Sequence, residues 1–261
     1  MTPSLGAALD QIDWSRPWLA PLREHGEVLV QGVRERGLVE ALNRDARTGS
    51  VALAAGRLQF VAQSALPAGE AYEAFIARTA RVPTRDNVHD FFNGLVWLQH
   101  PAIKRRLNEL QAGQIRLGAI EGRRGAVRDT LTLFDENAAL WQAPAVLVEA
   151  LRQRDWHTLF TTQRAAWADA TLTLFGHALI EKLTRPRKPI TAHVWVLPLD
   201  ADHSQGANLG ADAQALLLDA LTPERLAMRQ HLALPVLGVP GWWQANEQPD
   251  FYNDAAVFRP A

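Results

Sequence analysis

The sequence contains no cysteine among its 261 residues. This absence excludes disulfide bonds, thiolate nucleophiles and cysteine-ligated zinc, and it is typical of proteins from a reducing compartment. Long hydrophobic runs are also missing, because no stretch approaches the ~18 consecutive uncharged apolar residues of a membrane-spanning helix. The N-terminal MTPSLGAALDQIDW lacks a basic leader followed by an apolar run. We therefore expect a soluble, cytoplasmic protein with no membrane contact.

An excess of charge of either sign is absent as well. The chain has 27 Lys and Arg against 28 Asp and Glu, which gives a formal net charge of -1. This balance argues against a dedicated nucleic-acid-binding protein. A local basic surface that faces phosphate stays open, formed by KRR (104–106), GRR (122–124), Arg128 and RPRK (185–188), although charge runs are usually solvated faces. The Gly-rich GAIEGRRGAVR lacks the spacing of nucleotide-binding loops.

The residues that are present predict a mixture of helices and strands. A hydrophobic content of 48% with 21% charged residues is ordinary for a globular protein. Helical patterns cover about 17–31, 38–44, 87–99 and 163–183, together with AIKRRLNELQAGQI, PAVLVEALRQR, GADAQALLLDAL and TPERLAMRQHL. LQFVAQ (58–63) and ITAHVWVLPL (190–199) predict strands, and AYEAFIARTARV (71–82) favours a strand over a helix. DTLTLF, the turn residues DEN and AALWQ predict a β-hairpin.

This inventory predicts an α+β fold that is mostly helical with a small, partly antiparallel sheet. No linker rich in Pro, Ser or Gly divides the chain, so we expect a single globular domain over 1–261, with a helical N-terminal extension at 1–57. The segment 234–261 has no helical period and carries Trp242, Trp243, Phe251 and Tyr252. It predicts an ordered, irregular strap that its aromatic side chains pack onto the body.

The segment TRDNVHDFFNGLVW (84–97) places polar residues at the start of an otherwise apolar helix. Asn87 is a good N-cap, and Asp90 stands where a capping box reaches back, which explains Asp90 without any function. His89 lies in the first turn, where the helix dipole favours a neutral imidazole that can act as a base or a metal ligand. Asn93 follows one turn later on the same face. A structural role and a functional one are about equally supported for His89 and Asn93.

Two further segments carry histidine or carboxylates. In RDTLTLFDEN, Asp129 and Asp135 stand at the two ends of an expected strand, where carboxylates can bind metal or transfer protons. Glu136 and Asn137 are explained by ordinary turn chemistry. In FGHALIEKL, His177 and Glu181 are four residues apart on an apolar helix, which suits two metal ligands or a carboxylate that orients an imidazole. A buried histidine paired with Glu181 or with a carbonyl group is the simpler interpretation.

Five blocks in this order resemble a bacterial family, the domain of unknown function 3025. They are HDFFNGLVWLQHP, RDTLTLFDENAAL, FGHALIEKL, LGVPGWWQANE and FYNDAAVFRP. The resemblance runs from about Leu58 to the C-terminus and implies one unit that includes the aromatic tail. It implies no activity, cofactor or site residue. The family block more often has Ala at Gly94 and Phe at His100, which makes His100 a poor candidate for a shared site.

The leading hypothesis is a hydrolase-like enzyme whose polar pocket contains His89, Asn93, Asp129, Asp135 and His177. One histidine acts as the base, an aspartate orients it or binds a divalent metal ion, and Asn93 stabilises developing charge. The alternative is a non-catalytic module that binds a ligand or nucleic acid with its arginines and Trp-rich tail. A purely structural role for all these residues is the third possibility. The enzyme hypothesis requires these segments to meet in space.

Overall fold

A four-stranded sheet lies at the centre of the computed structural model, which describes residues 4–49, 51–121, 125–199 and 209–260. Its strands are β5 (Ala138–Gln142), β6 (Thr171–Leu174), β7 (Thr191–Leu197) and β8 (Leu232–Pro235). The spatial order is β6-β5-β7-β8. β5 pairs in parallel with β7, whereas the pairs β5–β6 and β7–β8 are antiparallel. Every residue of β5 is buried, so the centre of the sheet belongs to the core.

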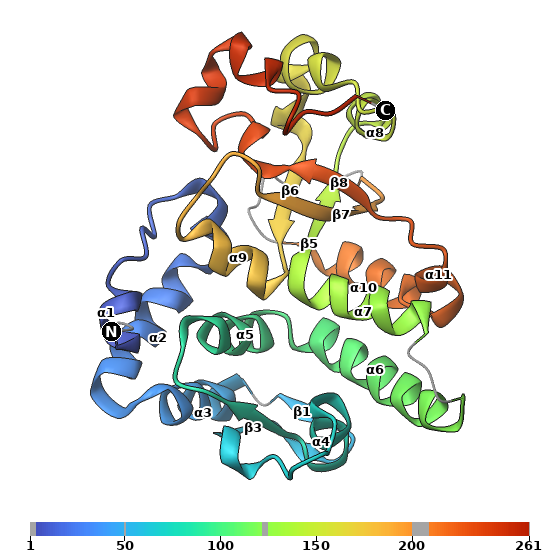
Figure 1. The fold of residues 1–261 in the computed structure, drawn as a ribbon. Coiled ribbons are helices and arrows are strands. Elements are labelled where there is room, and N and C mark those ends of the chain that lie inside the picture. The colour runs from blue at the N-terminus through green and yellow to red at the C-terminus, as the bar shows by residue number, and fades with distance from the viewer. Residues whose placement is uncertain (1–3, 50, 122–124, 200–208, 261) are drawn as a thin grey trace.

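Four helices pack below this sheet and enclose the polar residues discussed below (Figure 1). They are α5 (Val88–Gln99), α6 (Pro101–Glu121), α7 (Ala126–Asn137) and α9 (His177–Leu183). α5 contacts α9 and α6, and α7 contacts α6, α9 and β7. The first residues of α5 and α9 and the last residues of α7 therefore come together.

The N-terminal part of the chain covers the other side of α5. It contains α1 (Leu5–Leu9), α2 (Arg23–Arg36) and α3 (Leu38–Gly49), with a 3-10 helix over Pro17–Leu22. Two short antiparallel strands follow, β1 (Ala52–Leu53) and β2 (Gly56–Arg57). β3 (Gln59–Ala62) and β4 (Arg81–Thr84) form a parallel pair, and α4 (Tyr72–Thr79) connects them.

The C-terminal part combines short helices with 3-10 turns. α8 (Ala145–Arg152) follows β5, while α10 (Ala211–Ala220) and α11 (Pro223–Ala227) precede β8. The strap predicted for 234–261 is confirmed as an aromatic, irregular segment. It consists of the end of β8 and 3-10 turns at Val236–Gly238, Gln244–Glu247 and Pro249–Asn253. Its aromatic rings pack inward. The ring centroids of Tyr252 and Phe160 are 5.1 Å apart in a stacked arrangement, and those of Trp242 and Trp18 are 6.0 Å apart.

The structure confirms the mixed α+β class and corrects three element predictions. DTLTLF does not form a hairpin with AALWQ, because it lies inside α7; only AALWQ is a strand. AYEAFIARTARV is mainly the helix α4 instead of a strand. The long helix expected over 163–183 is a 3-10 turn over Arg164–Asp169, then β6, then α9. Pairing with β5 stabilises Thr171–Leu174 as a strand, despite the surrounding helical pattern.

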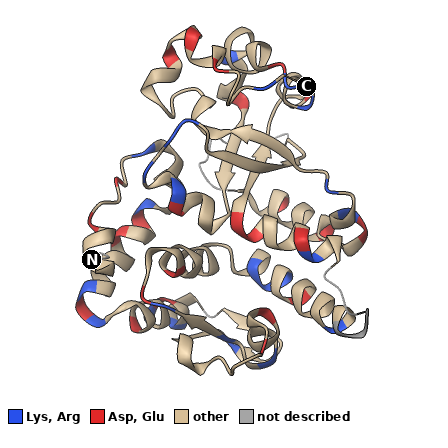
Figure 2. Ribbon diagram, in the orientation of Figure 1, with Lys and Arg blue, Asp and Glu red and all other residues tan. Residues whose placement is uncertain are grey.

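The basic runs do not form one surface among the described residues. In 104–106, Lys104 is buried, Arg105 pairs with Glu109 at 3.9 Å, and Arg106 donates to the Leu221 carbonyl. Figure 2 shows acidic residues interspersed with basic ones along the helices. GRR at 122–124 lies outside the described residues. None of the helices within the described ranges combines the length and hydrophobicity of a membrane span.

Candidate metal-binding site

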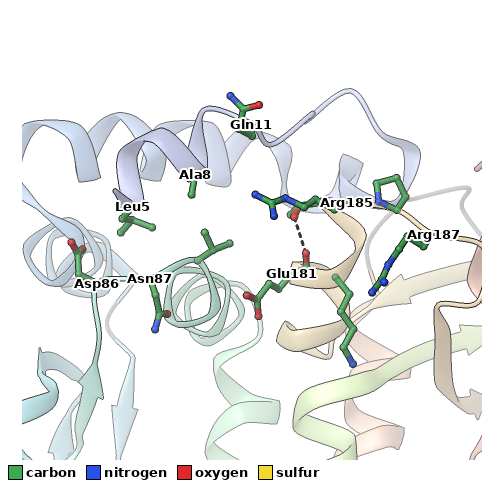
Figure 3. Close-up of a pocket in the computed structure, with 12 residues that line it drawn as sticks. Leu5, Ala8, Gln11, Asp86, Asn87, Glu181, Arg185 and Arg187 are labelled. Carbon is green, nitrogen blue, oxygen red and sulfur yellow. Dashed lines mark hydrogen bonds between the residues drawn. The ribbon is translucent and has the colours of Figure 1, made fainter. Parts of the chain in front are cut away.

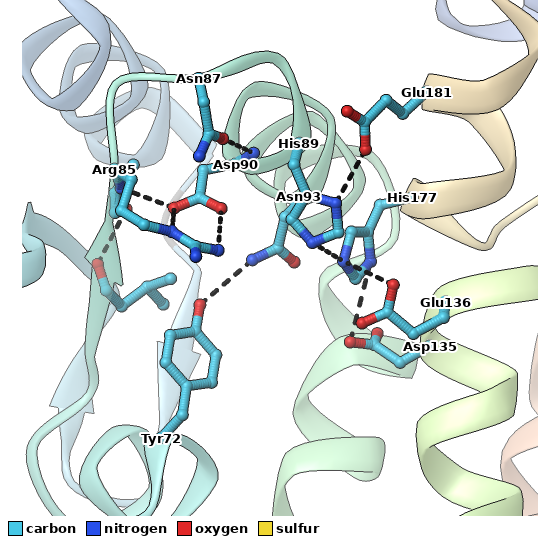
Figure 4. Close-up of polar contacts among 12 residues, drawn as sticks. Tyr72, Arg85, Asn87, His89, Asp90, Asn93, Asp135, Glu136, His177 and Glu181 are labelled. Atoms are coloured by element: carbon cyan, nitrogen blue, oxygen red, sulfur yellow. Dashed lines mark hydrogen bonds and ion pairs between the residues drawn. The ribbon is translucent and has the colours of Figure 1, made fainter.

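His89 and His177 meet where the N-termini of α5 and α9 come together (Figure 4). Their Nε2 atoms are 3.1 Å apart, and the two rings are edge to face with centroids 4.6 Å apart. The His177 side chain is 4% exposed and that of His89 is 30% exposed. Two of the residues singled out in the sequence therefore face one point, although 88 positions separate them along the chain.

The N-terminus of α5 is capped largely as expected. Asn87 accepts a hydrogen bond from the Asp90 backbone N–H at 2.7 Å. The Asp90 carboxylate, however, does not bind the Asn87 backbone as a capping box would. It accepts from the Arg85 backbone N–H at 2.5 Å and from the Arg85 guanidinium at 2.9 Å. Asp90 thus fixes the chain before α5, and this orders the turn that carries His89.

Each imidazole has a carboxylate on its Nδ1 side. Glu181 Oε2 lies 2.9 Å from His89 Nδ1, and Asp135 Oδ2 lies 3.8 Å from His177 Nδ1. The expectation that Glu181 pairs with His177 on the same helix is therefore wrong. His177, the first residue of α9, points its ring toward Asp135 and Glu136 at the end of α7. Glu181 instead contacts His89 of α5.

Glu136 completes a group of three possible metal ligands. Its Oε2 lies 3.5 Å from His177 Nε2. One ligand atom from each of His89, Glu136 and His177 lies within 4.8 Å of the other two. Two ligands at ~2.1 Å from one ion are ~3.0 Å apart at a right angle and ~3.4 Å apart at the tetrahedral angle. The two separations that involve His177, 3.1 Å to His89 Nε2 and 3.5 Å to Glu136 Oε2, therefore suit a shared ion.

Gly176 allows this approach of α9 to α7. A Cβ atom at this position would lie 2.4 Å from the Asn137 backbone nitrogen and 2.5 Å from the Glu136 carbonyl oxygen. These are backbone atoms, which cannot rotate away as a flexible side chain does. The Gly176 backbone is ordinary, with φ of -60°, so space and not conformation requires glycine here. The residue before His177 thereby brings its ring to Glu136.

A buried lysine organises the other side of the site. Lys104, which is 4% exposed, donates to Asp135 Oδ1 at 2.6 Å and to Asn93 Oδ1 at 2.9 Å. Asn93 in turn donates to the Tyr72 hydroxyl at 3.1 Å. Because both ends of the Asn93 amide have protein partners, its place in the structure is that of a connector between α4, α5 and α6.

The two imidazoles differ in basicity. The hydrogen bond with Glu181 raises the pKa of His89, which opposes the neutral form expected from the helix dipole. Burial lowers the pKa of His177 to about 4, although the Asp135 charge acts in the opposite direction. Burial acts to raise the pKa of Asp135, but the charge of Lys104 and the hydrogen bond that Lys104 donates act in the opposite direction, and the pKa of Asp135 is lowered. His177 is thus neutral at pH 7, with a lone pair available on the ring.

Asp129 lies outside this group. It is in the first turn of α7, six residues before Asp135, which places the two about 120° apart around the helix and nearly two turns apart along it. Its side chain is half exposed and lies 3.7 Å from Arg229. The expectation that Asp129 and Asp135 flank one strand depended on the hairpin, and it is wrong for the same reason. The structure brings together His89, Asn93, Asp135 and His177.

Sequence reasoning missed Glu136, Lys104 and Tyr72. Glu136 was explained as a turn residue, yet it lies in the last turn of α7 beside His177. Lys104 belongs to a KRR run that suggested a solvated face. A signal was available for two of the three. The adjacent carboxylates Asp135 and Glu136 can reach the same neighbour, and Lys104 directly follows the apolar Ala102 and Ile103. For Tyr72 the sequence offers no such signal.

An open pocket of about 970 Å³ lies beside the site (Figure 3). Glu181 lines it, together with α1, the turn before α5 and the segment after α9. Arg185 and Arg187 of the RPRK run are exposed at its edge, and neither forms an ion pair among the described residues. Glu181 both lines this pocket and contacts His89 Nδ1, so the pocket borders the Nδ1 side of the His89 ring.

The model of a family described as a protein of unknown function (DUF3025) matches residues 58–261. The chain belongs to this family. The resemblance seen in the five sequence blocks is thereby confirmed. All residues of the histidine and carboxylate group lie within the DUF3025 region, whereas α1, α2 and α3 precede it. Comparisons with curated proteins and with solved structures gave no match.

Proposed function

We propose that the protein is a metal-dependent, hydrolase-like enzyme that binds one divalent ion through His89, His177 and Glu136. The observation that carries this proposal is the convergence of two imidazole Nε2 atoms and one carboxylate, each from a different helix, at separations that suit a shared ion. Two histidines and one carboxylate are a common ligand set for catalytic zinc, with a further position open to water.

The surrounding carboxylates support this assignment. A histidine that binds metal through Nε2 usually donates its Nδ1–H to a carboxylate or carbonyl, which fixes the tautomer and orients the ring. Glu181 stands in this position for His89, at 2.9 Å from Nδ1. Asp135 Oδ2 lies 3.8 Å from His177 Nδ1 and would have to move closer to accept its N–H. Lys104 holds Asp135 in place. His89 therefore has a partner on Nδ1, which directs its Nε2 toward His177, where an ion would replace the contact between the two Nε2 atoms.

The chemistry follows from the ion and its surroundings. A bound divalent ion lowers the pKa of a water ligand and so supplies hydroxide near neutral pH. Burial and the neighbouring Asp135 charge raise the pKa of Glu136. A cation bound to Glu136 offsets the repulsion between the two carboxylates. His89 and Glu136 are partly exposed, so a substrate can reach the ion from their side. Asn93 acts in this proposal by positioning Lys104 and not by stabilising developing charge.

The alternative of a binding module built on the aromatic tail has less support. Trp242 and Tyr252 contact aromatic rings of the body, and Arg16 lies over the Trp243 ring at 5.6 Å. Phe251 is buried. These aromatic groups already have partners within the chain, which suits packing better than a clamp for a ligand.

Zinc binding by the purified protein tests the proposal. We expect isothermal titration of the metal-free protein to give one site per chain, and the variants His89→Ala and His177→Ala to lose about 100-fold or more in affinity. His157→Ala changes an exposed histidine outside the group and is the matched control. Circular dichroism establishes that each variant is folded. A folded wild type without zinc, cobalt or manganese binding, or variants that bind as the wild type does, would contradict the proposal.

A further inference from the structure

A second, smaller cavity lies on the far side of the carboxylates from the histidines. It has a volume of about 180 Å³, is partly open to the surface and is lined by residues of α4, α6 and α7. This equals the space of about six water molecules in the liquid. Its lining includes Glu73, Gln111, Arg128, Asp135 and Glu136. Because Asp135 and Glu136 also belong to the proposed metal site, a molecule in this cavity would lie next to the ion.

Gln111 offers an unused acceptor at this cavity. Its side chain is buried, with 7% of the residue exposed, and its Oε1 has no hydrogen-bond partner among the described residues. Its Nε2 donates to the Thr132 hydroxyl at 3.2 Å. That hydroxyl donates to the Arg128 carbonyl at 3.0 Å, so toward Gln111 it accepts. The amide orientation is thereby fixed, and Oε1 is left as an acceptor for a donor group in the cavity.

Glu73 adds a second acceptor. It accepts from Asn108 Nδ2, and no cation forms an ion pair with it among the described residues. Burial and the nearby Asp135 charge raise its pKa to about 7. A positively charged partner stabilises such a buried carboxylate strongly, because its charge offsets both the cost of burial and the repulsion from Asp135. Glu73 and Gln111 thus favour a group that is cationic and rich in N–H donors.

Arg128 gives the cavity a positive end. Arg128, Thr132, Asp135 and Glu136 occur at spacings of four, seven and eight residues, so they share one face of α7. Arg128 lies eight residues before Glu136, which is about 12 Å along the helix. It has no ion-pair partner in the part of the chain that the structure describes. The cavity therefore runs from carboxylates at one end to a guanidinium at the other.

We infer that this cavity binds a small linear amino acid, with its ammonium group at Glu73 and Gln111 and its carboxylate at Arg128. The inference names the substrate class for the proposed enzyme as compounds that release such an amino acid on hydrolysis, because the free amino acid itself has no bond for a hydrolase to cleave. It depends on that proposal for the reaction, though not for binding. A substrate held this way lies along α7 with its ammonium end nearest Glu136. The site thereby selects molecules that carry both charges over molecules that carry one.

The probe is 4-aminobutyrate, with butylamine and butyrate as controls that each lack one charged group. Ligand-observed NMR measures binding to the metal-free protein. We expect saturable binding of 4-aminobutyrate, with each control at least about tenfold weaker. Glu73→Gln and Gln111→Leu should weaken 4-aminobutyrate binding by about tenfold or more. Arg128→Gln should weaken it while leaving butylamine unaffected. Glu109→Gln, an exposed change on α6, should have no effect.

Several results would overturn the inference. They are the absence of saturable binding by folded wild type below about 10 mM, equal binding of 4-aminobutyrate and its controls, and full binding by Glu73→Gln and Gln111→Leu. Zinc titration of the same samples separates the two proposals. Zinc binding without amino-acid binding refutes only the substrate class, and amino-acid binding without zinc binding refutes only the metal site.

Discussion

At the scale of single residues, burial determines the protonation of the histidines more than helix position does. His100 ends α5, is 5% exposed, and its Nε2 has no partner among the described residues. Burial lowers its pKa to about 4. It resembles His177 in this respect, but it lies outside the metal-ligand group. The contrast with His89, whose pKa the Glu181 carboxylate raises, comes from a contact that only the folded chain provides.

Replacement of His100 tests this account of buried histidines. The pKa of His100 is higher in the unfolded chain, near 6.5, than in the folded chain. Between pH 6.5 and 4 the unfolded chain therefore binds more protons, and the folded state loses stability as the pH falls. For His100 alone, the free energy of unfolding at pH 5 is about 2 kcal/mol lower than at pH values well above 6.5. We expect His100→Phe to remove this share of the pH dependence. Urea unfolding at pH 5 and pH 7.5 measures it, and an unchanged difference between the two pH values would refute the account.

At the scale of elements, the pentapeptide TLTLF occurs twice with two different structures. Residues 130–134 lie inside the helix α7, whereas residues 171–174 form β6 and Phe175 follows it. In α7, Thr130 and Thr132 donate to carbonyls four residues earlier. In β6, the same residue types pair with β5. The local sequence predicted a strand for the first copy and a helix for the second, so tertiary contacts decide both.

This reversal explains which parts of the site could be predicted. His89 and His177 were identified because histidine on an apolar helix is informative in any fold. Asn87 was identified as the cap of α5 because capping is local. Glu136 was missed because an expected hairpin turn accounted for it, and Asp129 was included because the expected strand of that hairpin had a carboxylate at each end. Their positions depend on α7 being a helix, which short-range patterns did not reveal.

The junction of α7 and α9 provides a prediction at this scale. Gly176→Ala should push α9 away from the end of α7, because its Cβ would overlap backbone atoms of Glu136 and Asn137. We expect a loss of about 1–3 kcal/mol in unfolding free energy and at least a tenfold weaker affinity for zinc. At Gly113, within α6, an added Cβ would meet only the Arg116 side chain at 3.9 Å, an ordinary contact, so Gly113→Ala is expected to be neutral or stabilising. Equal metal affinities of the two variants would disprove the role given to Gly176.

At the scale of the whole molecule, one continuous hydrophobic cluster joins the N-terminal helices to the DUF3025 region. It includes Trp18 and Leu42 from the N-terminal part and Phe91 and Phe258 from the matched region. Leu42 of α3 packs against Gly94 of α5, where a Cβ would lie 2.5 Å from the Leu42 side chain. We propose that residues 1–57 fold together with the rest as one unit.

Truncation tests this unity. A chain of residues 58–261 leaves the α5 surface around Gly94 exposed, and we expect it to aggregate or to lose cooperative unfolding. The comparison is Leu42→Ala in the full chain, which should remain folded but lose about 2–5 kcal/mol. Size-exclusion chromatography and thermal unfolding measure both. A monomeric fragment that unfolds as cooperatively as the full chain would show that the N-terminal helices are an independent addition.

The most direct test of the central claim is a crystal structure of the zinc-loaded protein with anomalous scattering recorded at the zinc edge. The account predicts a single peak between α5, α7 and α9, with His89 Nε2, His177 Nε2 and a Glu136 oxygen each ~2.0–2.2 Å from it, and with Glu181 and Asp135 hydrogen-bonded to the Nδ1 atoms. A zinc-soaked crystal without a peak there, with the two histidines still hydrogen-bonded to each other, would contradict it.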